Sequence, residues 1–166
     1  EPAVSIIVPT YMGAKWIAQR IDNIREQDYP RSKVEVVIVD SGSPNGTAEI
    51  VKEYMEKHKD IIIRLIVEPV RRGKFSAVLK ALEHISPASE IIVLTDDDCL
   101  WSKEALKNVV KYFADPVVGA VTGSIRYIEE NGLSNIYRNF YNIIRIAESK
   151  LWSTPIANGP LLAIKK

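Results

Sequence analysis

Short apolar runs alternate with amphipathic segments along the first two thirds of the chain. Runs rich in Val and Ile at residues 4–8, 34–39, 61–67 and 91–94 predict buried β-strands. After each run, apolar residues recur three and four positions apart, which predicts a helix with one buried face. The expected buried positions are Ile17, Ile21 and Ile24; Ile50, Val51, Tyr54 and Met55; Phe75, Val78, Leu79 and Leu82; and Leu106, Val109, Val110 and Phe113.

The pattern changes after the fourth helix, for which Ser102 is the expected N-cap. Two further strands are expected at residues 117–121 and 124–128. Residues 133–152 then carry apolar side chains at helical spacing with basic residues between them, which predicts one long amphipathic helix. Such a helix either caps the core or lies against a membrane or another part of the protein.

Four successive strand–helix units predict an α/β fold, namely a Rossmann-like, mostly parallel sheet with helices on both faces. Right-handed crossovers bring the carboxyl ends of parallel strands to one edge of the sheet, where ligands bind. We therefore expect three segments to meet at that edge although they are far apart in sequence: residues 9–11, Asp40 and residues 96–98.

Composition and charge narrow the class of protein. The 166 residues are 46% hydrophobic and 26% charged, which is ordinary for a single globular domain. Lys and Arg number 22 against 21 Asp and Glu, so a basic surface for nucleic acid is not expected. No apolar run reaches the roughly 18 residues that span a bilayer. A chain that begins Glu1-Pro2 and ends Lys165-Lys166 is expected to be a soluble fragment of a longer protein.

The acidic triplet Asp96-Asp97-Asp98 follows the fourth strand directly. Adjacent carboxylates repel one another, and a divalent cation relieves that repulsion. Hard cations such as Mg²⁺ and Mn²⁺ prefer oxygen ligands and combine one or two carboxylates with substrate phosphates. In an extended segment Asp96 and Asp98 would point the same way and Asp97 the other. The alternative is a solvated acidic turn, or negative charge placed at a helix N-terminus.

Two other polar segments favour an anionic ligand. Asp40 ends an apolar run and precedes Ser41-Gly42-Ser43, where the backbone is free to approach a ligand. The segment Arg71-Arg72-Gly73-Lys74 precedes a helix and supplies cations suited to a diphosphate. Taken alone, the first segment is also consistent with a plain turn, and the second with solvated surface.

Four motifs occur in the order and spacing of a known family. They are residues 8–11 (Val-Pro-Thr-Tyr), residues 39–43 (Val-Asp-Ser-Gly-Ser) with Gly46 and Thr47, residues 72–74 (Arg-Gly-Lys) with Ala77, and residues 94–98 (Leu-Thr-Asp-Asp-Asp). With them the chain resembles family 2 glycosyltransferases over nearly its whole length. That resemblance implies a GT-A fold, cut short at the C-terminus, and inverting transfer of a sugar from a nucleotide sugar, in the first place a UDP-sugar.

The resemblance also implies a role for each matching residue. Pro9, Thr10 and Tyr11 would border the nucleoside pocket, and Asp40 would read the base. The segment Arg72-Gly73-Lys74 would lie near the pyrophosphate.

In the acidic triplet, Asp96 and Asp98 match the family's metal-binding Asp-x-Asp motif, with Asp98 the direct ligand of Mg²⁺ or Mn²⁺. Asp97, also on the donor side, fills a position more often occupied by Ala. The choice of ligand among the three therefore stays open.

Residues 137–166 resemble the acceptor-side region of membrane-associated members related to hyaluronan, chitin and cellulose synthases. Residues 1–130 would then be a donor-binding subdomain, and residues 131–166 the start of an acceptor-side region in which Asn158 and Gly159 approach the acceptor. Gly159 is equally consistent with a plain turn formed with Pro160. The acceptor is expected to be a saccharide or lipid-linked, with the whole protein at the cytoplasmic side of the cell membrane. The family's catalytic base is expected beyond Lys166, so this chain alone is expected to bind donor and transfer poorly.

Three other classes of protein are alternatives to a glycosyltransferase. A sugar nucleotidylyltransferase is disfavoured because residues 9–13 lack a Gly-rich loop with Arg and Lys. A receiver domain is disfavoured because its acidic pair would follow the first strand. A non-catalytic module that only binds a nucleotide sugar stays open, because a binding site alone does not specify transfer.

Overall fold

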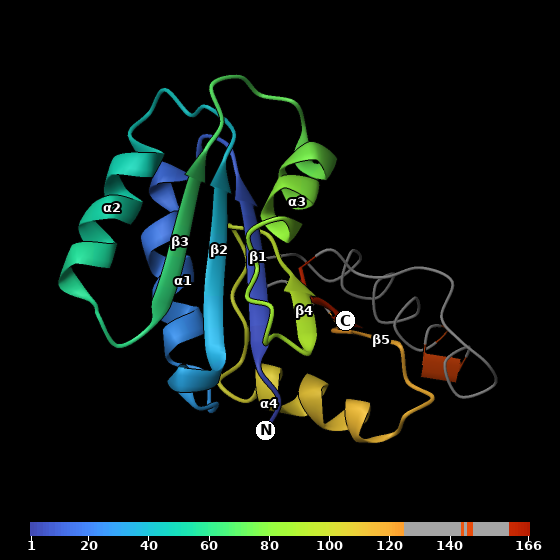
Figure 1. Cartoon of the computed structure of the whole chain (residues 1–166). Coiled ribbons are helices and arrows are strands. Elements are labelled where there is room, and N and C mark those ends of the chain that lie inside the picture. The colour runs from blue at the N-terminus through green and yellow to red at the C-terminus, as the bar shows by residue number, and fades with distance from the viewer. Residues whose placement is uncertain (125–143, 145, 148–159) are drawn as a thin grey trace, which may run out of the picture.

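The computed structural model describes residues 1–124, 144, 146–147 and 160–166 (Figure 1). Several expectations lie wholly or largely outside these residues: the strand at 124–128, the long helix at 133–152, and the acceptor-side residues Asn158 and Gly159.

Within the described ranges, six strands form one sheet in the order β3-β2-β1-β4-β6-β5. The neighbouring pairs among the first four strands are parallel, whereas β6 runs antiparallel to both β4 and β5. This confirms the mostly parallel α/β fold. The strands are β1 (Val4–Thr10), β2 (Val34–Asp40), β3 (Ile62–Val67), β4 (Ile91–Leu94), β5 (Ala120–Thr122) and β6 (Leu162–Lys165).

Helices cover both faces of the sheet, as predicted (Figure 1). One face and the helices α1, α2 and α4 share the larger hydrophobic core, and α3 packs on the other face over β1 and β2. The α-helices are α1 (Ile17–Arg25), α2 (Thr47–Lys57), α3 (Lys74–Leu82) and α4 (Ala105–Val110). Short 3₁₀ turns are η1 (Gly13–Lys15), η2 (Arg31–Lys33) and η3 (Lys111–Ala114).

The buried face predicted for α3 is wrong for Phe75, Leu79 and Leu82, whereas Val78 is partly buried and packs against the core as expected. Ala77 and Ala81 are the residues packed fully against the sheet, whereas Phe75 is 76% exposed, and Leu79 and Leu82 are exposed as well. Ala77 and Ala81 lie one helical turn apart and therefore share a face, and their small side chains let the helix backbone approach β1 and β2 closely. Phe75 precedes Ala77 by two positions and so points away from the sheet.

Two boundaries after β4 also differ from expectation. Ser102 does not cap a helix: α4 begins at Ala105, and the Ser102 carbonyl accepts the Ala105 N–H at 2.9 Å in the preceding turn. The strand expected at 117–121 is confined to β5, and Val117 is 89% exposed. Asp115 holds the chain in a turn by accepting the N–H groups of Val117 and Val118, so extended pairing starts later.

Glu35 is buried on β2, at the end of the sheet opposite the strands' carboxyl edge, and it accepts hydrogen bonds from Ser5 Oγ, the Ser86 N–H and Arg64 Nε. Burial alone would raise the pKa of Glu35, but these bonds and the Arg64 charge outweigh it and hold that pKa below its usual value. A carboxyl whose folded-state pKa is depressed stabilises the fold above its unfolded pKa. That contribution is lost as pH falls through the folded-state pKa.

We therefore expect Glu35→Gln to lower the free energy of unfolding by about 1–2 kcal/mol near neutral pH. The difference from wild type should begin to shrink below roughly pH 4, the ordinary glutamate pKa, and disappear once the pH is below the lower folded-state pKa, where the wild-type carboxyl is neutral. Urea denaturation at the two pH values measures this. Glu53→Gln on the exposed side of α2 is the matched control. An equal loss at both pH values would show that the contribution of Glu35 does not depend on its charge.

Candidate functional site

The carboxyl edge of the sheet brings together the three segments that the parallel topology predicted. Thr10 and Asp40 are opposite one another in the register of β1 and β2, and each is the last residue of its strand. Beside them, the Thr95 N–H donates to the Ile7 carbonyl at 3.1 Å, which starts the acidic segment directly from the end of β4.

The three acidic side chains have different surroundings. Thr10 Oγ1 donates to Asp97 Oδ2, and Lys74 Nζ forms an ion pair with Asp96 Oδ1. Asp98 is exposed and has no hydrogen-bond or ion-pair partner among the described residues. The expectation of an extended segment is wrong here, because the chain turns at Asp97 and Asp98 while Cys99 Sγ folds back to within 3.3 Å of the Asp96 carbonyl.

The surroundings of the partly buried Asp97 disfavour the charged form of its carboxyl. Burial raises its pKa, and the charges of Asp98 and Asp96 raise it further, against the opposing effect of the Thr10 hydrogen bond. A Cβ at Gly13 would overlap both Thr10 Oγ1 and Asp97 Oδ2, so only glycine fits at this position. The sequence reasoning gave Gly13 no role in the site. Its one available signal was a glycine closely following the end of the first strand.

Asp40 presents an unused acceptor at the sheet edge. The side chain is 1% exposed, and its Oδ1 accepts from both the N–H and the hydroxyl of Ser43. The Ser43 hydroxyl in turn accepts the Met12 N–H at 2.8 Å, which ties the end of β1 to the turn after β2. Asp40 Oδ2 is buried and has no partner among the described residues. A buried carboxylate oxygen without a donor is costly, and a ligand N–H would satisfy it.

The basic segment lies between β3 and α3 and reaches the same edge. The Arg71 guanidinium stacks over the Tyr11 ring at 4.3 Å, and Lys74 contacts Asp96 as described above. Gly73 has φ of 92°, a conformation that favours glycine, and it turns the chain into α3 immediately before Lys74. Arg72 is exposed beside it. Cations from one loop therefore border both the aromatic ring after β1 and the acidic turn after β4.

A buried arginine that the sequence reasoning missed lies beneath the acidic turn. Arg20 on α1 is 0% exposed, donates to Thr95 Oγ1 at 2.8 Å and to Asn23 Oδ1 at 2.6 Å, and lies 4.0 Å from the Trp101 ring centre. Burial lowers the pKa of Arg20 to about 10, while Cys99, Asp96 and Asp97 oppose the shift, so the side chain is charged at neutral pH. The sequence could have indicated this burial through the helical repeat, because Arg20 falls on the same helix face as Ile17, Ile21 and Ile24.

The donor atoms fit a divalent cation that also binds a ligand. The described residues contain no group of three or more His, Cys, Asp or Glu side chains placed to hold a metal by themselves. Mg²⁺ does not need one, because it commonly takes one or two carboxylates and completes its coordination with water and phosphate oxygens. Asp98, exposed and unpartnered beside Asp96, is suited to that arrangement.

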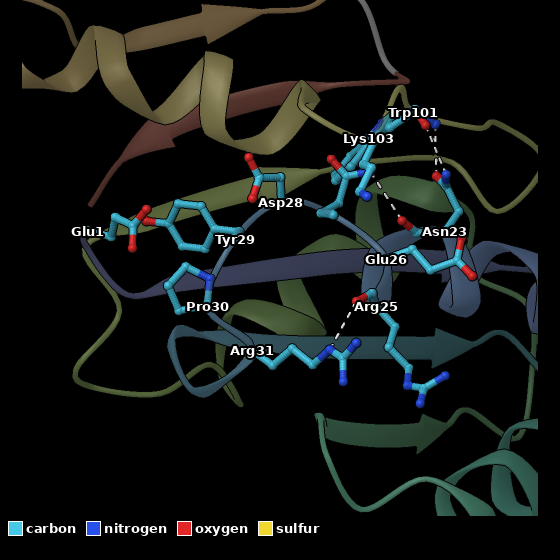
Figure 2. Close-up of a pocket in the computed structure, with 11 residues that line it drawn as sticks. Glu1, Asn23, Arg25, Glu26, Asp28, Tyr29, Pro30, Arg31, Trp101 and Lys103 are labelled. Atoms are coloured by element: carbon cyan, nitrogen blue, oxygen red, sulfur yellow. Dashed lines mark hydrogen bonds between the residues drawn. The ribbon is translucent and has the colours of Figure 1, made fainter.

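A cavity with a volume of about 770 Å³ lies elsewhere, next to the C-terminal end of α1 (Figure 2). Its lining is polar and mixed in charge, with Arg25, Arg31 and Lys103 alongside Glu1, Glu26 and Asp28. Figure 2 also shows Asn23 hydrogen-bonded to Trp101 at the rim of this cavity. The sheet-edge residues Thr10, Asp40 and Asp98 do not line this cavity.

Comparison with known proteins gives consistent results. The family model described as glycosyl transferase family 2 matches residues 5–166. The chain is 30% identical over 144 residues to glycosyltransferase AglE of Haloferax volcanii, covering 86% of this chain and 46% of that protein. It is 30% identical over 168 residues to hyaluronan synthase of Streptococcus pyogenes, covering 95% and 39%.

Among solved structures, the mannosyltransferase PcManGT of Pyrobaculum calidifontis, in complex with GDP-Man and Mn²⁺, superposes with a TM-score of 0.89. The two chains are 48% identical, and the match covers 99% of this chain and 45% of that one. The chain thus spans less than half the length of these relatives. In the described residues, no helix combines the length and the apolar character that crossing a membrane requires.

Proposed function

The chain belongs to glycosyl transferase family 2 and has its GT-A fold, and on that premise we propose that it forms the donor-binding part of a metal-dependent, inverting hexosyltransferase. The donor is a nucleotide sugar, and the acceptor is a saccharide or a lipid-linked molecule. Residues 1–130 bind the donor, and residues 131–166 begin the acceptor side.

One observation carries the donor site: unused acceptors of two kinds lie at the same sheet edge. Asp40 Oδ2 is a buried acceptor that no donor in the described part of the chain reaches, and it suits the N–H edge of a nucleobase. Asp98 is an exposed carboxylate without a counter-ion among the described residues, and it suits a metal. Tyr11, with Arg71 stacked on it, and Lys74, paired with Asp96, supply an aromatic ring and cations suited to a nucleoside diphosphate.

In this proposal Asp98, assisted by Asp96, holds Mg²⁺ or Mn²⁺. The bound metal supplies positive charge that stabilises the departing nucleoside diphosphate. The relative PcManGT was solved with GDP-Man and Mn²⁺, which supports a divalent metal here. Lys74 leaves Asp96 and bonds the diphosphate when donor binds, and Arg72 adds a second cation. Pro9 and Thr10 border the nucleoside.

The identity of the base is left to experiment. The family resemblance favours a UDP-sugar, whereas the mannosyltransferase at 48% identity holds GDP-Man. Uracil and guanine both present a ring N–H, and either satisfies Asp40. We further propose that Asn158 and Gly159 approach the acceptor, that a base beyond Lys166 removes its proton, and that the whole protein works at the cytoplasmic side of the cell membrane.

Thermal unfolding with GDP and with UDP, each with and without Mn²⁺, tests the proposal. One of the two nucleotides is expected to stabilise the protein only when metal is present, by about 2.7 kcal/mol at a hundred times its Kd. ATP with Mg²⁺ is the control for non-specific binding of polyphosphate. Equal stabilisation by all three nucleotides would contradict a base-reading site, and no stabilisation by any would overturn the proposal. Sugar transfer by the whole protein then separates an enzyme from a non-catalytic binding module.

A further inference from the structure

Arg20 is a buried cation whose hydrogen bonds within the described residues go to neutral groups. Its partners are Asn23 Oδ1 and Thr95 Oγ1, and its Nε has no partner among the described residues. Burying a guanidinium without a carboxylate partner costs free energy that an apolar residue on the same helix face would not. The packing of α1 therefore does not account for an arginine at this position.

The partners of Arg20 connect two segments of the site. Thr95 Oγ1 accepts from Arg20 and donates to the Pro160 carbonyl at 2.8 Å. The Trp101 indole N–H donates to the same carbonyl at 2.9 Å, and the Arg20 guanidinium lies over that indole ring. Cys99 Sγ also donates to this carbonyl, at 3.6 Å, so Arg20 contacts two of the three side chains that hold it. Thr95 immediately precedes the acidic turn, and Pro160 immediately follows the Asn158-Gly159 pair.

Helix α1 fixes this arrangement from a second side. Asn23, one turn after Arg20, accepts the Trp101 N–H at 2.8 Å and donates to the Trp101 carbonyl at 2.9 Å (Figure 2). Asn23 also accepts from Arg20 itself. The two terminal nitrogens of one planar guanidinium therefore fix the positions of Thr95 and Asn23 together. A lysine has a single ammonium group and lacks this forked geometry.

We propose that Arg20 is a positioning residue that holds the acidic turn and the chain at Pro160 in one fixed relation, so that the donor and acceptor sides meet at reacting distance. The inference rests on the proposed function, because it assigns donor binding to the turn and acceptor binding to the residues before Pro160. Misplacing reactants by about 1 Å can cost a hundredfold in rate, so a small shift at Thr95 matters for transfer.

If Arg20 acted only as a counter-charge for the three carboxylates, its removal would strengthen metal binding. A positive charge beneath three carboxylates relieves their repulsion, but it also opposes a cation that binds them. Removing the charge would then tighten Mn²⁺ binding. A positioning role instead predicts that Arg20→Lys, which keeps the charge and loses the fork, impairs transfer as Arg20→Met does.

The test uses the whole protein with Arg20→Lys, Arg20→Met and Thr95→Val, and Arg25→Met as the control arginine on the same helix. Turnover is measured with Mn²⁺ and whichever of GDP-mannose and UDP-N-acetylglucosamine the wild type uses. All three site variants are expected to lower kcat by at least about tenfold, with KM for the donor and Kd for the nucleoside diphosphate changed by less than about threefold. The Trp101 indole N–H resonance in NMR should shift in the Arg20 variants and stay unchanged in the control.

Each alternative outcome has one meaning. Wild-type kcat in Arg20→Lys would overturn the inference, as would tighter Mn²⁺ binding by Arg20→Met at unchanged kcat. Thr95→Val and Arg20→Lys keep the test decisive if Arg20→Met does not fold. If the wild type uses neither donor and binds neither nucleotide, the proposed function itself fails, and the inference fails with it.

Discussion

Asp98→Asn is expected to weaken Mn²⁺-dependent binding of the nucleoside diphosphate by roughly a hundredfold or more, since even the loss of a residue that only supports a metal ligand commonly costs ten- to a hundredfold. Asp98 is exposed and unpartnered among the described residues, so the substitution removes no contact that holds the fold. Isothermal titration of GDP or UDP in the presence of saturating Mn²⁺ measures the effect.

The unfolding temperature of Asp98→Asn without metal separates this explanation from misfolding. Removal of one of three adjacent carboxylates relieves like-charge repulsion, so the metal-free variant should unfold at the wild-type temperature or slightly above it. Glu53→Gln, an exposed acidic residue on α2, makes the same change in net charge and should bind as the wild type does. Wild-type affinity in Asp98→Asn would show that the acidic turn does not hold the metal.

The four parallel strands were predicted to within two residues at either end, and β4 at both ends, because each is a run rich in Val and Ile. β6 was not predicted, because its place between β4 and β5 depends on pairing with segments far away in the sequence. The buried face of α3 was partly wrong because two alanines, which carry little hydrophobic signal, make the contact that decides it.

The residues of the site likewise fall into those that the sequence predicted and those that it did not. Thr10, Asp40 and the acidic turn follow strands directly, so parallel topology alone places them at one edge. Arg20 lies on a helix, and its role depends on a hydrogen bond to a residue 75 positions away, which no local pattern specifies. The direction in which each of the three carboxylates points could not be predicted from a local pattern either. The chain turns at Asp97 and Asp98, so the side chains do not alternate as they do in an extended strand.

Asp40→Asn is expected to weaken nucleoside diphosphate binding without weakening the fold. Ser43 occupies Oδ1, so an amide oxygen there keeps both of its hydrogen bonds. The amide nitrogen then takes the place of Oδ2. Because this nitrogen is a hydrogen-bond donor, it cannot accept the N–H of the base. Losing a hydrogen bond to a charged group costs about 1.5–3 kcal/mol, which is roughly ten- to a hundredfold in Kd. Because the buried and unpartnered Oδ2 is costly in the free protein, stability should be unchanged or higher.

The choice of ligand distinguishes base reading from a general loss of affinity. Pyrophosphate with Mn²⁺ has no base, so Asp40→Asn should bind it as the wild type does. Cytosine presents an acceptor where uracil has its ring N–H, so the variant should discriminate less between CDP and the preferred nucleotide. Titration of these ligands against both proteins gives the comparison. A parallel loss for pyrophosphate would mean that Asp40 supports the diphosphate or the metal, whereas undiminished binding of every nucleotide would remove it from the site. The expected pattern is lost affinity, retained stability and relaxed selectivity together, because a side chain that only supports the fold would change stability first.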